Sequence, residues 1–203
     1  MGLSFVGCGE TSSESNETAG TYRVKVVRAE FPTSQRLGET TLLTIGVRNA
    51  GRKTIPALTV TTSVAGKAGE DSTLPFGIRD PQPGLAQPDR PVWVLSARYP
   101  RLAGSSTPAG AETAARKTFA FGPLKPGRLI EAVWKLNAVK SGKFTLLYKI
   151  GAGLSGAGKA TTAAGVEPGG SFSVHISTAP PNTIVTDNGE VVTIPSKPRR
   201  GPR

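Results

Sequence analysis

The sequence contains one cysteine, one histidine and few aromatic residues, and each shortage excludes a class of protein. The single cysteine, Cys8, cannot form a disulfide within the chain, so the fold has to be stable through its core alone. One cysteine and one histidine, His175, do not supply the ligands of a zinc site. No apolar run reaches the roughly 18 residues of a transmembrane helix. The composition therefore favours a packed domain without disulfides, metal or membrane spans.

Catalytic motifs are missing as well. A Ser-His-Asp triad would need His175, but this residue alternates with Phe172, Val174 and Ile176, a pattern that predicts a solvent-facing histidine on a strand. The sequence has no Gly-x-Ser-x-Gly elbow. The glycine-rich segment 151–158 lacks the Lys and Ser/Thr that end a phosphate loop. We therefore expect no enzyme activity and no cofactor, with a hydrolase that uses loop carboxylates as the catalytic alternative.

Acidic residues are few relative to basic ones, with 14 Asp and Glu against 25 Lys and Arg, and the net charge is +11. A basic surface can attract nucleic acid, anionic lipid headgroups or cell-wall polyanions. The basic residues are scattered singly along the chain, without the interleaved aromatics of a nucleic-acid-binding stripe. We therefore expect a solvated basic surface and no nucleic-acid partner.

The segment Phe5–Gly9, read as Phe-Val-Gly-Cys-Gly, has the pattern of a bacterial lipoprotein signal, in which a small residue precedes the lipidated cysteine. A secretory signal needs a basic segment and roughly 7–15 apolar residues. Only residues 1–7 precede Cys8, and none of them is Lys or Arg. Our hypothesis is that Met1 is a late or misassigned start and that residues 1–8 are the remnant of the signal. The alternative is a stray thiol.

Composition divides the rest of the chain into three parts. Residues 9–21 are rich in Ser and Glu and predict a flexible tether. Residues 22–195 alternate apolar and polar side chains and predict a single domain. Residues 196–203 carry Pro and Arg without apolar support and predict a disordered basic tail.

The domain reads as a series of strands with almost no helical period. Leu43, Ile45 and Val47 share one face of a predicted strand, and the following Arg48–Arg52 segment predicts a turn because Asn and Gly tolerate positive φ. The sequence Asp-Asn-Gly at 187–189 predicts a hairpin. The pattern indicates an all-β fold, an antiparallel immunoglobulin-like β-sandwich with two long loop insertions. Strands are expected at 22–26, 40–47, 55–64, 92–99, 119–121, 129–139, 143–150, 171–176, 183–186 and 190–194, and the insertions at 66–91 and 100–117.

Two stretches carry a family resemblance. The segment Leu43–Gly51, followed by a Thr/Val strand, resembles the opening of bacterial Ig-like envelope modules of the CARDB and NEW3 type. Trp134 and the segment Gly142–Tyr148 are similar to their later strands. The resemblance implies an extracytoplasmic sandwich used for adhesion or as an accessory module, and it brings no catalytic residues.

The long loops are the expected binding surface, because binding residues gather on loops held by a rigid scaffold. Phe76 and Ile78 are candidate apolar anchors, if exposed at a loop tip, and Asp80 and Asp89 are candidate polar contacts. Trp93, Tyr99 and Trp134 are in register with the apolar faces of their strands and are expected in the core.

These observations favour a non-catalytic module of the bacterial cell envelope. A lipid on Cys8 would hold it at the outer face of the cytoplasmic membrane, with a cell-wall polymer or another envelope protein as a further partner. The alternative is a secreted carbohydrate- or protein-binding accessory domain without the lipid.

Overall fold

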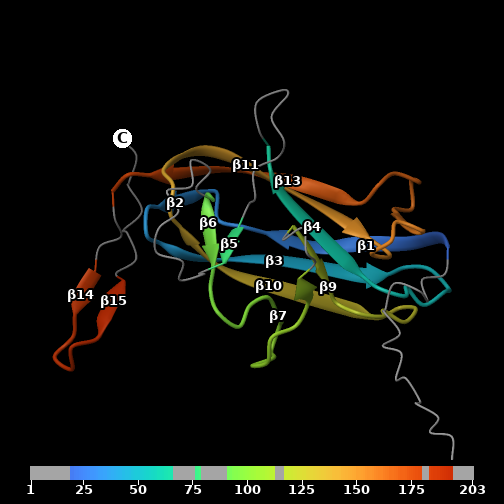
Figure 1. Ribbon diagram of the computed structural model, residues 1–203, viewed down its shortest axis with the longest axis horizontal. Helices are drawn as coiled ribbons and strands as arrows, with labels where there is room; N and C mark the ends of the chain where they lie inside the picture. Colours follow the sequence, from blue (N-terminus) through green and yellow to red (C-terminus); the bar gives the residue numbers. More distant parts are fainter. Residues whose placement is uncertain (1–18, 66–75, 79–90, 113–116, 180–182, 194–203) are drawn as a thin grey trace, which may run out of the picture.

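The computed structural model describes residues 19–65, 76–78, 91–112, 117–179 and 183–193 (Figure 1). These residues form strands and turns, and no helix among them could cross a membrane. The strands are β1 (Gly20–Glu30), β2 (Ser34–Arg36), β3 (Thr40–Asn49), β4 (Thr59–Val64), β5 (Phe76–Ile78), β6 (Trp93–Leu95), β7 (Arg101–Leu102), β8 (Ala111–Glu112), β9 (Thr118–Ala120), β10 (Leu129–Ala138), β11 (Gly142–Gly151), β12 (Gly158–Thr161), β13 (Gly169–Ser177), β14 (Thr183–Val185) and β15 (Val191–Thr193).

Two sheets form the body of the molecule. Sheet one has the order β12-β1-β3-β10-β6-β5, with β7 also paired to β10, and sheet two has the order β2-β13-β11-β4-β9-β8. The central pairs are antiparallel, whereas the edge pairs β12–β1, β5–β6 and β2–β13 are parallel. The predicted antiparallel sandwich is therefore confirmed at its centre. Three of its four edges are parallel pairs, and the fourth, β8 with β9, is antiparallel.

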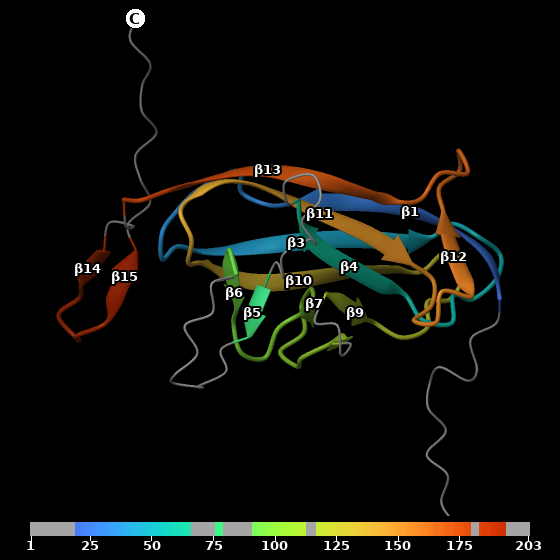
Figure 2. The same ribbon diagram turned by 45° about the horizontal axis from the view of Figure 1, so that its top comes forward.

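The order of the strands is that of an immunoglobulin domain, in which strands A, B, E and D form one sheet and strands C, F and G the other. Here β1, β3, β10 and β6 take the positions of A, B, E and D, and β4, β11 and β13 take those of C, F and G. The chain departs from the simple module between β4 and β10. This stretch supplies β5, β6 and β7 to sheet one and β8 and β9 to sheet two. Figure 2 shows β5, β6, β7 and β9 along one side of the sandwich.

Strand alternation builds the core between the sheets. Leu43, Ile45 and Val47 of β3 are all buried, as predicted. Trp93 and Trp134 are fully buried, which confirms their expected place in the core. Tyr99 is half-buried, with the guanidinium of Arg101 4.4 Å from its ring centroid.

The structure corrects the expected insertions and two strand boundaries. The expected loops at 66–91 and 100–117 include β5, β7 and β8, which are too short to show an alternating pattern. The expected strand at 92–99 ends at Leu95, because the chain turns at Arg98, whose φ is 65°. The expected strand from residue 55 begins at Thr59, since Ile55 instead forms a separate bridge to Leu124.

The predicted C-terminal hairpin is present. Strands β14 and β15 pair in antiparallel register, and Gly189 in the turn has a φ of 77°, a value that favours glycine. Figure 2 shows this hairpin beside the sandwich rather than within it. Ile184, Val185 and Val192 are exposed on it.

Candidate anion-binding end

The residues singled out from the sequence do not assemble into a site among the described residues. Cys8, Asp80 and Asp89 lie outside them. Phe76 is only 2% exposed, so the condition for its role as an anchor, exposure at a loop tip, is not met. Its strand pairs with β6 at the edge of sheet one, and its ring centroid lies 6.4 Å from that of Phe119 in the core. Ile78 belongs to the same strand and pairs with Leu95.

A different set of residues comes together where four segments meet at one end of the sandwich. The start of β1 pairs with the end of β3 through Val24 and Asn49, and the start of β10 pairs with β3 through Leu129 and Arg48. Strand β12 lies along the start of β1, and the bridge between Ile55 and Leu124 joins the two neighbouring connections.

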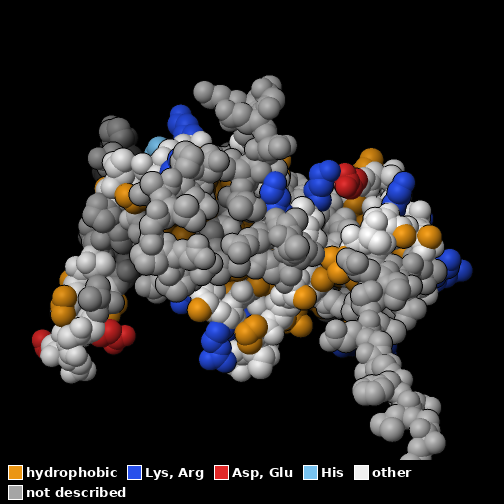
Figure 3. Space-filling model, viewed as in Figure 1, with side chains coloured by type: hydrophobic (Ala, Val, Ile, Leu, Met, Phe, Trp, Pro, Cys, Tyr) orange, Lys and Arg blue, Asp and Glu red, His pale blue; other side chains and the backbone are white. Residues whose placement is uncertain are grey.

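These four segments are rich in cations. Residues 19–27, 47–59, 118–130 and 150–166 contain eight Lys and Arg residues and no Asp or Glu. All eight side chains are exposed, and none forms an ion pair within the described residues. Figure 3 shows Lys and Arg side chains at this end, at the right of the view. We call this surface the basic end; its residues are Arg23, Lys25, Arg48, Arg52, Lys53, Lys125, Arg128 and Lys159.

One buried amide holds the loops of the basic end in place. Asn49 is 1% exposed, and its Nδ2 donates to the backbone oxygens of Lys53 at 2.9 Å and Leu124 at 2.7 Å. Its Oδ1 accepts from the backbone N–H of Gly51 at 2.9 Å. Neither Asn49 nor Gly51 has a positive φ. The turn predicted at 48–52 therefore forms through side-chain hydrogen bonds of Asn49 rather than through left-handed backbone.

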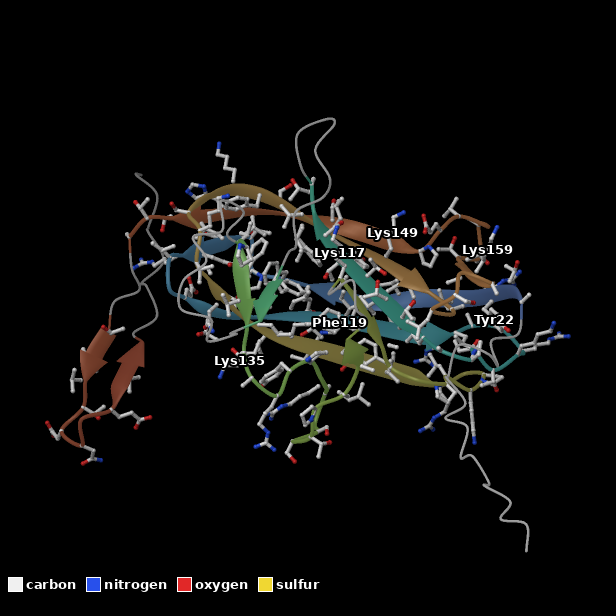
Figure 4. The ribbon with its side chains drawn as sticks, in the orientation of Figure 1. Tyr22, Lys117, Phe119, Lys135, Lys149 and Lys159 are labelled. Carbon is white, nitrogen blue, oxygen red and sulfur yellow. The ribbon has the colours of Figure 1, made fainter. Side chains whose placement is uncertain are left out.

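A cleft of about 450 Å³ opens at the basic end. Three cations line it, together with two threonines, one tyrosine and the backbone of the Asn49 turn. Because cationic groups and hydroxyls can both donate hydrogen bonds to oxyanions, the cleft is suited to a phosphate or carboxylate group. Figure 4 places Tyr22 and Lys159 at this end of the molecule. The lining residues are Thr21, Tyr22, Arg23, Ala50, Gly51, Arg52, Lys53 and Thr161.

A second hollow of about 520 Å³ lies next to it, on the outer face of sheet two. Thr61 and Thr118 line it and share a hydrogen bond of 2.8 Å between their hydroxyls. Lys149 also lines it, but its Nζ lies 3.1 Å from the carboxylate of Glu167. Glu167 offsets the charge of Lys149, which leaves Lys159 as the one unpaired cation among the described residues that line this hollow. The first cleft has three cations and no carboxylate among its lining residues in the described part of the chain, so it is the better suited of the two to an anion.

The described residues contain no group of three or more His, Cys, Asp or Glu side chains that could hold a metal ion. His175 is exposed on β13, as its alternation predicted, and pairs across the strands with Lys143.

No protein-family model and no curated protein matches the chain. Solved structures similar to it include the CARDB domain of a Pyrococcus furiosus protein in complex with di-metal ions, at 12% identity and a TM-score of 0.40, with 83% of this chain and 99% of that domain covered. Another is native alpha-2-macroglobulin of E. coli, at 17% identity and a TM-score of 0.40, with 79% of this chain and 7% of that protein covered. A third is a cohesin module from a Clostridium perfringens family 33 glycoside hydrolase, at 10% identity and a TM-score of 0.41, with 80% and 99% covered.

The CARDB-type resemblance predicted from the sequence thus has a counterpart among solved structures. The immunoglobulin-like fold itself is established by the strand order of the two sheets.

The basic end was missed by the sequence prediction because its cations are far apart in the chain. Arg23 and Lys159 are brought together only by the pairing of β1 with β12. The sequence did carry one signal, since four separate segments contain Lys and Arg but no Asp or Glu. Composition alone does not show that these segments lie on one surface.

Proposed function

We propose that this protein is a non-catalytic binding module of a bacterial cell envelope that recognises an anionic envelope component through its basic end. The observation that carries the proposal is that eight exposed cations lie at one end of the sandwich, in segments without Asp or Glu, and that three of them line a cleft. Unpaired cations on a rigid scaffold attract polyanions and steer their approach. The scaffold here is a sandwich whose loops are held by Asn49.

The proposal includes a lipid anchor at Cys8 and a position at the outer face of the cytoplasmic membrane. The lipoprotein pattern of Phe5–Gly9 supports this part. Intact-mass and fractionation analysis of the native protein beside a Cys8→Ala variant tests it. A mature chain that begins at Cys8, carries a diacylglyceryl mass and sediments with membranes is expected. A chain without added lipid in the culture medium would favour the alternative, a secreted accessory domain.

Binding itself is tested with soluble polyphosphate as a probe of anionic polymers, and neutral dextran as the control. We expect the full chain to bind polyphosphate, to lose affinity steeply as salt is raised, and to ignore dextran. Binding to dextran alone, or to neither polymer, would contradict the proposed recognition. Turnover of a substrate would contradict the non-catalytic role.

A further inference from the structure

We infer that the anionic component recognised by the basic end is the lipid surface itself, and that this end of the sandwich faces the membrane. This inference rests on the proposed function and names its partner: phosphate-bearing headgroups of anionic lipids. Three observations support it, namely the place where the chain enters the fold, the distribution of charge between the two ends, and the position of the cleft.

The chain enters the sandwich at the basic end. Gly20 begins β1, its backbone N–H donates to the oxygen of Ala157 at 3.2 Å, and it pairs with Gly158. Ala19 lies eleven residues after Cys8 in the chain, and a fully extended chain spans at most about 3.6 Å per residue. A lipid on Cys8 therefore keeps the basic end within about 40 Å of the bilayer, whatever path the chain takes.

The opposite end is not suited to the same contact. There the acidic residues Glu30 and Glu39 lie among the cations, and the carboxylate of Glu39 accepts a hydrogen bond from the backbone N–H of Arg36 at 2.7 Å. Lys140 and Lys143 are exposed at this end. A mixed surface is attracted weakly to an anionic membrane, because its charges partly cancel within a Debye length of about 8–10 Å.

The cleft gives the basic end a site for a single headgroup. Arg23, Arg52 and Lys53 line it from two connected segments, and the hydroxyls of Thr21 and Thr161 add neutral donors. Leu129, which is 39% exposed, lies beside Arg48 in the ladder and offers an apolar contact at the level of the headgroups. An acyl chain plus a polybasic patch is the combination that makes membrane attachment stable.

The test uses the full chain carrying Cys8→Ser, so that no membrane binding comes from a lipid on Cys8. Its sedimentation with vesicles of phosphatidylcholine is compared with sedimentation on vesicles that also contain phosphatidylglycerol. We expect binding to the phosphatidylglycerol vesicles only. The double variant Arg52→Gln/Lys53→Gln should bind them roughly 25-fold more weakly, since each cation near an anionic surface changes the affinity about five-fold.

The control is Lys140→Gln/Lys143→Gln, which removes the same charge from the opposite end. It should retain most of the binding. Equal losses in the two double variants would overturn the inference, because net charge alone would then explain the attraction. Binding to polyphosphate without binding to the vesicles would also overturn it while leaving the proposed function intact, and loss of both would end both proposals.

Discussion

Each end of the sandwich has one buried amide side chain, and the two amides bond to different kinds of group. At the basic end, Asn49 makes three hydrogen bonds to backbone groups of the β3–β4 and β9–β10 connections. At the opposite end, Gln35 is 1% exposed and joins the two sheets. Its Oε1 accepts from Nε1 of Trp93 at 2.8 Å, and its Nε2 donates to the oxygen of Pro32 at 2.8 Å.

Aromatic rings pack around Trp93, the partner of Gln35. Trp93 lies against Phe31 and Phe144 in edge-to-face geometry, with ring centroids 5.4 and 6.1 Å apart, and Phe31 contacts Phe172 in the same way. The opposite end is therefore closed by its core, whereas the basic end is closed by hydrogen bonds under exposed cations. The comparison teaches that the two ends of one sandwich can be closed by different kinds of contact.

The largest effect is expected from Asn49→Ala. The change leaves backbone groups of Gly51, Lys53 and Leu124 without their partner, and we expect a loss of about 3 kcal/mol in the free energy of unfolding. Because Arg52 and Lys53 lose their fixed positions, binding to phosphatidylglycerol vesicles should also fall, by about the five-fold effect of one cation. Urea unfolding and vesicle sedimentation measure the two effects. A variant that is less stable but binds normally would separate the turn from the binding surface.

Gln35→Ala should affect stability without affecting binding. It leaves Nε1 of Trp93 and the oxygen of Pro32 without partners, and we expect a loss of about 2 kcal/mol in the free energy of unfolding. Vesicle binding, measured without urea under conditions where the variant is folded, should equal that of the parent chain. Weaker binding would show that the two ends are coupled.

The two buried tryptophans give a matched and smaller test. Nε1 of Trp93 is bonded to Gln35, whereas Nε1 of Trp134 has no hydrogen-bond partner among the described residues. Both substitutions to Phe remove similar volume, but only Trp93→Phe leaves a buried amide oxygen unpaired. We expect Trp93→Phe to be less stable than Trp134→Phe by about 1–2 kcal/mol in thermal or urea unfolding. Equal losses would mean that the bond to Gln35 adds nothing beyond packing.

The smallest effect concerns the ion pair between Arg28 and Glu30, whose nearest nitrogen and oxygen lie 2.8 Å apart on the exposed face of β1. The hydrogen bond from Arg28 lowers the pKa of the Glu30 carboxyl below its ordinary value of 4.5. A lowered pKa stabilises the folded state at pH values above the ordinary pKa of the group. This contribution is lost as the pH falls through the lowered pKa.

Glu30→Gln should therefore leave stability at pH 7 nearly unchanged, because both partners are exposed and screened. The variant should lose slightly less stability than the parent chain when the pH falls below 4.5. Thermal unfolding at several acidic pH values measures the difference. A large loss at neutral pH would indicate a role of Glu30 beyond the pair.

The sandwich could be predicted because its central strands follow the period of two. Leu58, Val60 and Thr62 share a face by alternation, and all three are buried. The short edge strands could not be predicted in the same way, since the two residues of β8 or the three of β5 are too few to show a period. Their pairing depends on neighbours that are distant in the sequence.

The basic end could not be predicted from the sequence for the same reason. Each of its cations looked like an isolated solvated charge, and only the register of β1 with β3 and β12 places Arg23 near Arg52 and Lys159. Asn49 was interpreted as a turn residue from its type. Its burial could not be read from the sequence, because that depends on the connection through Leu124.

The parallel pairing of β12 with β1 has a consequence for the order of folding. It joins Gly20 to Gly158, so the first strand made by the ribosome lacks one neighbour until most of the chain has been synthesised. Until then β1 is an open strand edge that a second chain can pair with. A chain cut short before β12 is therefore expected to aggregate rather than to fold as a smaller sandwich.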